Sequence, residues 1–155
     1  MKAMSESSAQ PIFSSVCLAA DHGGFEIQEE LFSWLSDSGV VVHHLGPRTL
    51  DEDDDYPAYA QAVAESVQNH ERRVGVLLCR SGAGMTIVAN RFPGVRAVVC
   101  RTQEDARLAR EHNDANVLVL EGDHVSSEEA RELFLTFVGT PFAGGRHERR
   151  LQQFE

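Results

Sequence analysis

Hydrophobic positions along the chain follow two alternating patterns: short continuous apolar runs, and longer stretches in which apolar residues recur at helical spacing. The continuous runs predict strands covered on both faces, because a strand with one wet face would alternate apolar and polar residues. The five predicted strands are residues 16–20, 40–45, 74–79, 96–100 and 116–120.

Amphipathic stripes between these runs predict helices that pack on the sheet. The stripes are formed by Ile27, Leu31, Trp34 and Leu35, by Ala60, Val63, Ala64 and Val67, and by Ala130, Leu133, Phe134 and Phe137. Ser126 or Ser127 is available as the N-cap of the last of these helices, and residues 103–112 form a charged, helix-prone stretch. Strict alternation of strands and helices implies right-handed crossovers. The predicted fold is therefore α/β, a Rossmann-like three-layer α/β/α sandwich with a five-stranded parallel sheet.

The domain organisation follows from length and from the two ends of the chain. A chain of 155 residues has the size of one compact domain. Residues 1–15 are polar and without periodicity, so we expect a flexible leader. Residues 16–155 are expected to form a single domain, in which a Pro/Gly turn after residue 140 leads into a basic C-terminal helix.

Charge and composition exclude several classes of partner. A formal net charge of -10 removes the attraction to polyphosphate that binders of nucleic acid or anionic membranes need. No apolar run approaches the roughly 20 residues of a membrane span, and the polar start lacks a signal-peptide core, so we expect a cytoplasmic protein. Cys17, Cys79 and Cys100 have no C-x-x-C spacing, so neither a disulfide framework nor a zinc site is indicated. We expect no metal and no cofactor.

Chemically capable residues follow the predicted strands, where ligands bind in open parallel sheets. Asp21 and His22 follow the first strand, Cys79 ends the third, and His112 and Asn113 precede the fifth. We place all of them at the mouth of the sheet. Each also has a purely structural interpretation: Asp21 as a helix cap, Cys79 as a small buried apolar residue, and His112 as a helix C-terminal residue.

The loop after the third strand, Cys79-Arg80-Ser81-Gly82-Ala83-Gly84, is the most informative segment. Its backbone N–H groups converge before a helix, an arrangement that holds an oxyanion and favours a thiolate at Cys79. It is not a dinucleotide fingerprint, because the third glycine is replaced by Ile87, and it lacks the Gly-Lys-Ser/Thr of a P-loop. Met85 occupies the position where a Cys-dependent phosphatase loop needs arginine.

The tail offers a second candidate anion site. Arg146 and Arg150 lie four residues apart on one helical face, so their guanidinium groups are able to clamp a phosphate. Lys2 is the only lysine among the 14 basic residues, which leaves arginine, the better oxyanion ligand, for such a role. We expect His147, between the two arginines, to face water.

The acidic run 51–55 is expected to be a solvated loop, because it lacks the glycine and the final glutamate of a calcium-binding loop. Within it, only Asp55, next to Tyr56, is a candidate for a role in the site.

These motifs together resemble the ribose-5-phosphate isomerase B and galactose-6-phosphate isomerase family, over residues 16–151. The resemblance is carried by residues 21–24, 55–60, 79–84 continuing to Asn90, 94–97, 110–116 and 144–147. It implies interconversion of an aldose phosphate and its ketose through a cis-enediol, most simply of ribose 5-phosphate and ribulose 5-phosphate, with neither metal nor nucleotide. It also implies a homodimer or a dimer of dimers whose sites are shared between subunits.

The resemblance implies a role for each matching residue. Cys79 is expected to be the base, Ser81 with the N–H groups of Gly82, Ala83 and Gly84 to stabilise the enediolate, and His112 to open the sugar ring from the partner's chain. Asp21 and Asp55 would contact sugar hydroxyls, with Tyr56 and Asn113 in the same binding site. The phosphate would be held by His22, Arg146 and Arg150.

Two departures from the family pattern bear on the substrate. Arg80 occupies a position where the family usually has glycine, and Asp123 one where it commonly has a phosphate-binding arginine. We interpret Arg80 as a substitute for that missing charge. A four- or six-carbon sugar phosphate stays an alternative substrate, and a non-catalytic sugar-phosphate-binding protein stays an alternative function.

Overall fold

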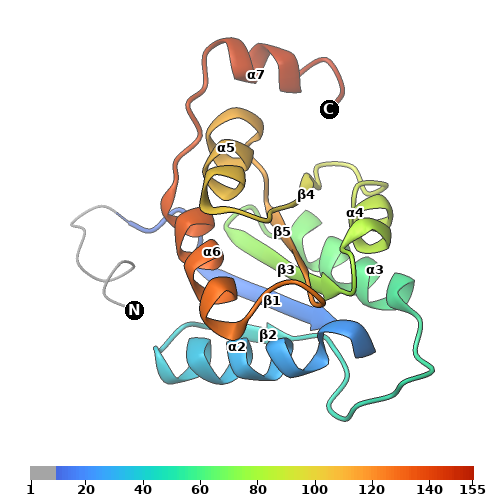
Figure 1. The fold of residues 1–155 in the computed structure, drawn as a ribbon. Coiled ribbons are helices and arrows are strands. Elements are labelled where there is room, and N and C mark those ends of the chain that lie inside the picture. Colours follow the sequence, from blue (N-terminus) through green and yellow to red (C-terminus); the bar gives the residue numbers. More distant parts are fainter. Residues whose placement is uncertain (1–9) are drawn as a thin grey trace.

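A computed structural model describes residues 10–155 and contains one parallel sheet of five strands (Figure 1). The strand order is β2-β1-β3-β5-β4. The strands are β1 (Ser15–Ala20), β2 (Val42–His44), β3 (Arg73–Cys79), β4 (Ala97–Val99) and β5 (Val117–Glu121). The predicted fold class is confirmed. The edge strands β2 and β4 are shorter than predicted, because each has a ladder partner on one side only.

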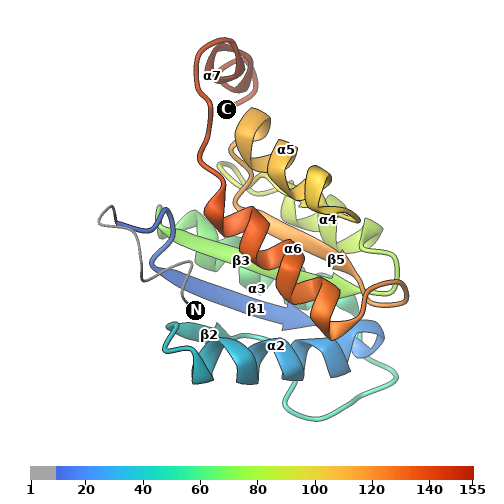
Figure 2. The same cartoon turned by 60° about the vertical axis from the view of Figure 1, so that its left-hand side comes forward.

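Helices cover both faces of the sheet (Figures 1 and 2). One face carries α2 (Phe25–Asp37), α5 (Gln103–Asn113) and α6 (Ser127–Gly139), and the other carries α3 (Tyr56–Gln68) and α4 (Ala83–Ala89). A 3-10 turn, η1 (His22–Gly24), links β1 to α2, and α7 (Arg146–Leu151) follows α6. Across residues 10–155, every helix is too short or too polar to cross a bilayer.

Each face of the sheet has its own apolar layer, as the predicted stripes require. Leu31 and Leu35 of α2 pack with Phe134 and Phe137 of α6 on one face, all of them almost fully buried. Val63 of α3 and its neighbours form the layer on the other face. The continuous apolar strands are therefore covered from both sides, which is why they showed no alternation.

Residues 10–15, the described part of the predicted leader, belong in part to the folded domain. Residues 1–9 lie outside the described part, but Phe13 is 4% exposed and β1 begins at Ser15. Phe13 packs beneath the guanidinium of Arg110, whose Cζ lies 4.9 Å from the ring centroid. One aromatic residue in a polar stretch carries no periodicity, so the sequence pattern placed the boundary too late.

Arg110 is a buried cation that joins three segments. It is 2% exposed, and its Nη1 donates to Asp114 Oδ1 at 2.8 Å and to the Ala115 carbonyl at 2.6 Å. Its Nε donates to the carbonyl of Thr140 at 3.1 Å, where the chain leaves α6 toward α7. The end of α5 and the connection to α7 therefore share one guanidinium.

We expect Arg110→Met to lower the free energy of unfolding by about 3 kcal/mol, because the carbonyls of Ala115 and Thr140 lose their charged donor while remaining near the core. Urea denaturation measures this loss. The control is Arg107→Met on the same helix, whose ion pairs with Glu104 and Glu111 are surface-exposed, with an expected cost below about 1 kcal/mol. Equal losses of unfolding free energy in the two variants would contradict the stabilising role of the buried Arg110.

Candidate active site

Three loops meet at the carboxyl edge of the sheet, after β1, β3 and β5. The N–H of Gly122 donates to the carbonyl of Cys79 at 2.7 Å, and the N–H of Asp123 donates to the carbonyl of Arg80 at 3.2 Å. A Cβ added at Gly122 would lie 2.2 Å from the carbonyl oxygen of Gly23. Such a close backbone approach admits only glycine, so these loops form one compact rim.

Cys79 ends β3 with its side chain at this rim. It is 6% exposed, and the N–H of Gly82 points at Sγ with an N···S distance of 3.1 Å. Gly82 adopts a left-handed conformation, with φ of 76°, which favours glycine at this turn. That N–H is a donor suited to a sulfur bearing negative charge.

The two other thiols lie in the interior. Burial raises the pKa of Cys17 to about 11 and that of Cys100 to about 12. Both are therefore protonated thiols at neutral pH and serve packing rather than proton transfer.

The rest of the 79–84 loop is organised around its own side chains. The exposed Ser81 accepts from the N–H of Ala83 at 3.3 Å. Two of the three N–H groups expected to face an oxyanion, those of Gly82 and Ala83, thus already contact Cys79 and Ser81. Gly84 lies against Tyr56, since a Cβ there would be 2.4 Å from Cζ of the ring. Tyr56 and the loop therefore lie together.

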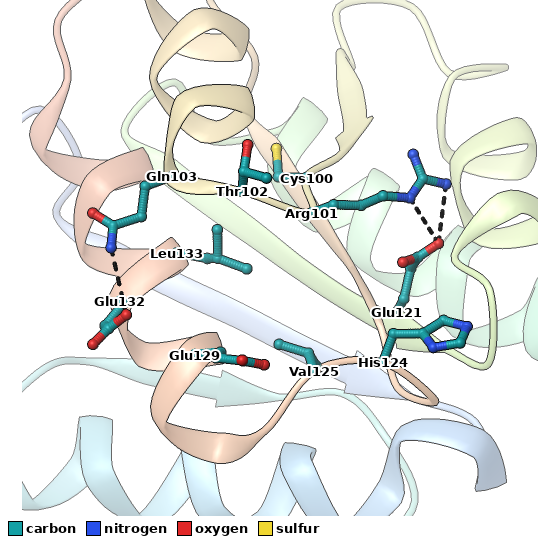
Figure 3. A pocket seen from close by; sticks show the side chains of 10 residues that line it. All are labelled: Cys100, Arg101, Thr102, Gln103, Glu121, His124, Val125, Glu129, Glu132 and Leu133. Carbon is teal, nitrogen blue, oxygen red and sulfur yellow. Dashed lines mark hydrogen bonds and ion pairs between the residues drawn. The ribbon is translucent and has the colours of Figure 1, made fainter.

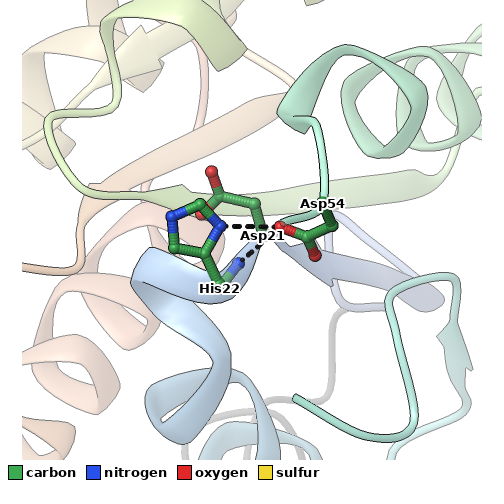
Figure 4. A group of neighbouring side chains, drawn as sticks. All are labelled: Asp21, His22 and Asp54. Atoms are coloured by element: carbon green, nitrogen blue, oxygen red, sulfur yellow. Dashed lines mark hydrogen bonds and ion pairs between the residues drawn. The ribbon is translucent and has the colours of Figure 1, made fainter. Parts of the chain in front are cut away.

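A histidine–carboxylate pair follows β1 (Figure 4). His22 Nδ1 lies 2.7 Å from Asp54 Oδ1, and this hydrogen bond raises the pKa of His22. Asp21 is 6% exposed and accepts from the N–H of Gly23 at 2.9 Å. Burial raises the pKa of the Asp21 carboxyl. Three ionisable groups thus lie side by side at the rim.

One donor atom from each of Asp21, His22 and Asp54 lies within 4.8 Å of the others, a spacing that three ligands of a cation also show. Here, however, His22 and Asp54 bond directly to each other, which accounts for the cluster without an ion. The sequence pattern did not single out Asp54, because only Asp55 of the acidic run adjoins a candidate site residue. Asp55 is exposed and precedes α3 without a side-chain cap. Because all five positions from 51 to 55 are acidic, the sequence pattern contains no signal that Asp54 is the one whose side chain points into the protein.

Arg80 crosses the same rim. Its side chain is 65% exposed, its Cγ lies over Gly23, and its Nη1 lies 3.4 Å from Asp123 Oδ1. The two positions at which the sequence departs from the family pattern are therefore neighbours in space. Arg80 and Asp123 form a loose surface ion pair.

His112 and Asn113 do not lie at this rim, so their placement at the mouth of the sheet was wrong for a single chain. Helix α5 returns from the carboxyl end of β4 to the start of β5, and 11 helical residues span about 16 Å. The N–H of Asn116, just after the helix, bonds to the carbonyl of Arg96 before β4. His112 therefore lies at the amino edge, because a crossover helix runs antiparallel to its strands.

Helix α7, which carries the predicted arginine clamp, lies beside α5 and away from the carboxyl ends of the strands (Figure 2). His147 stacks on His112 with 4.2 Å between ring centroids and 12° between planes, so one face of its half-buried ring is covered. Burial lowers the pKa of His147, and the nearby His112 adds to the effect. Arg146 and Arg150 are exposed, and neither forms an ion pair within residues 10–155. The predicted site residues therefore form two groups, which we call half-sites. One lies around Cys79 at the carboxyl edge of the sheet, and the other lies around His112 at the amino edge.

A cavity of about 410 Å³ borders the Cys79 half-site, between the first turns of α5 and α6 (Figure 3). Arg101 and Glu121 bond across it at 3.0 Å, and Glu121 is the ladder partner of Cys79. His124 and Glu129 also line it. The cavity thus adjoins the rim, and its lining includes Cys100 but not Cys79.

A parallel sheet with a thiol loop and a histidine–carboxylate pair at its carboxyl edge defines a small-molecule enzyme of the Rossmann-like class. Comparison with known proteins agrees: a family model described as Ribose/Galactose Isomerase matches residues 16–154. The chain belongs to this family of aldose–ketose isomerases.

Similar proteins include ribose-5-phosphate isomerase B of Escherichia coli, 39% identical over 88% of this chain and 91% of that protein. A Thermotoga maritima ribose 5-phosphate isomerase structure is 43% identical, with a TM-score of 0.84 over 90% of this chain and 96% of that one. A Mycoplasma genitalium ribose-5-phosphate isomerase B structure, with ribulose-5-phosphate bound, is 35% identical, with a TM-score of 0.86 over 90% and 92% of the two chains.

Proposed function

We propose that this protein interconverts ribose 5-phosphate and ribulose 5-phosphate through a cis-enediol. The observation that carries the proposal is Cys79, a thiol at the end of β3 with the Gly82 N–H directed at its sulfur. The Cys79 thiolate takes the proton from carbon 2 of the open-chain aldose, and the electron pair moves to the carbon 1 oxygen. The proton on sulfur then returns to carbon 1, while the proton of the carbon 2 hydroxyl passes to the carbon 1 oxygen, so that carbon 1 becomes the alcohol and carbon 2 the carbonyl.

The neighbouring groups support this transfer. Ser81 and the N–H of Gly84 stabilise the enediolate oxygen, a role worth roughly 3 kcal/mol for one well-placed donor. Asp21 and Asp55 bind sugar hydroxyls, with the Tyr56 ring against the loop. His22, already polarised by Asp54, binds the phosphate.

The remaining functions come from a second copy of the chain. His112 opens the sugar ring, Asn113 binds the sugar beside it, and Arg146 and Arg150 hold the phosphate, but all four lie at the opposite edge from Cys79 of their own chain. A two-fold interface that places the amino-edge half-site of one subunit against the carboxyl-edge half-site of the other completes two identical sites.

The proposed assembly is a homodimer or a dimer of dimers. Two apolar side chains support it, since Ile87 of α4 is 64% exposed and Phe154 beyond α7 is 66% exposed. The net charge of -10 argues against nucleic acid or an anionic membrane as an additional partner. We place the enzyme in the cytoplasm, where a catalytic thiol stays reduced.

Incubation with ribose 5-phosphate in deuterated water tests the function. The proposed enzyme converts the sugar and introduces deuterium at carbon 1 of ribulose 5-phosphate and carbon 2 of the returned aldose, because the proton on sulfur exchanges with solvent. Binding without conversion or label would favour the non-catalytic alternative.

The Arg80–Asp123 pair bears on the length of the sugar, because Arg80 lies over Gly23, next to His22, the residue proposed to bind the phosphate. We expect Arg80→Gly to raise KM for ribose 5-phosphate about 10-fold, through loss of one charged contact with the substrate. Arg101→Gly, which removes an arginine of similar exposure paired with Glu121, is the control and leaves KM unchanged. An unchanged KM in Arg80→Gly would remove Arg80 from the phosphate site, and four- and six-carbon aldose phosphates assayed alongside measure the preferred length.

A further inference from the structure

Asp54 is the one carboxylate of the acidic run 51–55 that turns into the protein. Its side chain is 6% exposed, whereas Asp51, Asp53 and Asp55 are exposed. Asp54 Oδ1 accepts two hydrogen bonds from one residue: His22 Nδ1 at 2.7 Å and the His22 backbone N–H at 3.1 Å (Figure 4). The loop between β2 and α3 is therefore fastened to the end of β1 through this carboxylate.

The double contact fixes both the orientation and the tautomer of the His22 ring. A carboxylate at Nδ1 requires a proton there, so Nε2 is the ring nitrogen left for a ligand. The hydrogen bond from the His22 backbone N–H keeps Asp54 Oδ1 in place beside the His22 ring. The imidazole is 25% exposed, and its free nitrogen is therefore within reach of a bound molecule.

The other oxygen of this carboxylate also lies inside the protein. Asp54 Oδ2 is buried, and no donor within residues 10–155 meets hydrogen-bond geometry to it. The hydroxyl of Tyr59 lies nearby, and burial, with Asp54 as the next cause, raises its pKa.

We propose that Asp54 is a positioning residue for His22, holding the ring with its Nδ1–H engaged so that Nε2–H donates to the phosphate of the bound sugar. The substrate atom that accepts from Nε2 of His22 is identified only through the proposed function, whereas the pairing of Asp54 with His22 is independent of it. The charged groups facing His22 are Asp21, Asp54 and Arg80. Hydrogen bonding to Asp54 and the charge of Asp21 favour the imidazolium, and burial and Arg80 oppose it. The hydrogen bond to Asp54 is the largest of these effects, so its removal is expected to lower the pKa of His22.

The test compares Asp54→Asn with Asp53→Asn, which removes the same charge from an exposed neighbour. The ring nitrogens of His22, assigned by their disappearance in His22→Gln, are titrated by 15N NMR in the ligand-free protein. Asp54→Asn is expected to lower the pKa of His22 by at least about one unit, and Asp53→Asn to leave it unchanged.

In isomerase assays, Asp54→Asn is expected to raise KM about 10-fold with a smaller change in kcat, because the ground-state phosphate contact is weakened. Asp54→Glu is expected to restore part of the lost affinity.

The wild-type spectrum is decisive even where the Asn variant does not fold. A His22 whose neutral form carries its proton on Nε2 overturns the proposal, as does an equal pKa in Asp54→Asn and wild type, or an equal decrease in both Asn variants. Because this titration needs no substrate, its failure is separable from failure of the isomerase assignment. An intact pairing in a protein that does not convert ribose 5-phosphate would contradict the proposed function and the phosphate contact, and leave Asp54 as the residue that orients His22.

Discussion

Replacement of Cys79 by alanine is expected to lower kcat for isomerisation by about 10³-fold or more, the usual contribution of a positioned acid–base group. The substrate still binds, because its phosphate and hydroxyl contacts come from other side chains. Proton transfer is lost, because burial keeps the two remaining thiols, Cys17 and Cys100, protonated. The measurements are the rate of ribulose 5-phosphate formation and the appearance of deuterium at carbon 2 of the aldose.

Two further variants separate the chemistry of Cys79 from its place in the loop. Cys79→Ser keeps an acceptor for the Gly82 N–H but supplies a much weaker acid, so it is expected to be as inactive as the alanine variant. Cys100→Ala removes a buried thiol next to the end of β4 and is expected to retain activity, at some cost in stability. Substantial activity in Cys79→Ala with normal folding would refute the proposed base.

The fold was predictable from the sequence because burial on both faces of a parallel sheet leaves a continuous apolar run. The β3 segment is the clearest example: residues Val74 to Cys79 are all buried, and the prediction differs from β3 by one residue. At the edge strand β2, where packing is one-sided, the same argument overestimated the length. Pattern arguments are thus strongest at the centre of the sheet.

The site was predictable where function depends on local chain geometry and not where it depends on spatial pairing. The loop 79–84 carries its own glycines, so its conformation is encoded locally. The contact between Asp54 and His22 joins residues 32 positions apart and has no local signal. His112 was placed at the wrong edge of the sheet because the end of a crossover helix adjoins the next strand's beginning, not its carboxyl end. Residues just after a strand and residues just before one lie at opposite edges of a parallel sheet.

That opposite placement leads to the second large effect, recovery of activity on mixing two inactive variants. Cys79→Ala and His112→Ala are each expected to retain less than about one hundredth of wild-type activity, because every site contains one defective half. Unfolding them together in equal amounts and refolding allows the subunits to reassort. Half of the resulting dimers then pair one variant with the other, and one of their two sites combines an intact Cys79 with an intact His112, so activity rises to about one quarter of wild type.

Mixing Cys79→Ala with Cys79→Ser is the matched control, because no reassortment of these two chains assembles an intact site, and its activity is expected to stay at the level of the separate variants. Native mass spectrometry of differently tagged chains measures how much mixed dimer has formed. Mixed dimers without recovered activity would mean that His112 acts within its own chain. That result would require α5 and α7 to move across the sheet, since the Ala143 N–H bond to the Glu111 carbonyl and the Arg96–Glu155 pair hold them at its amino edge.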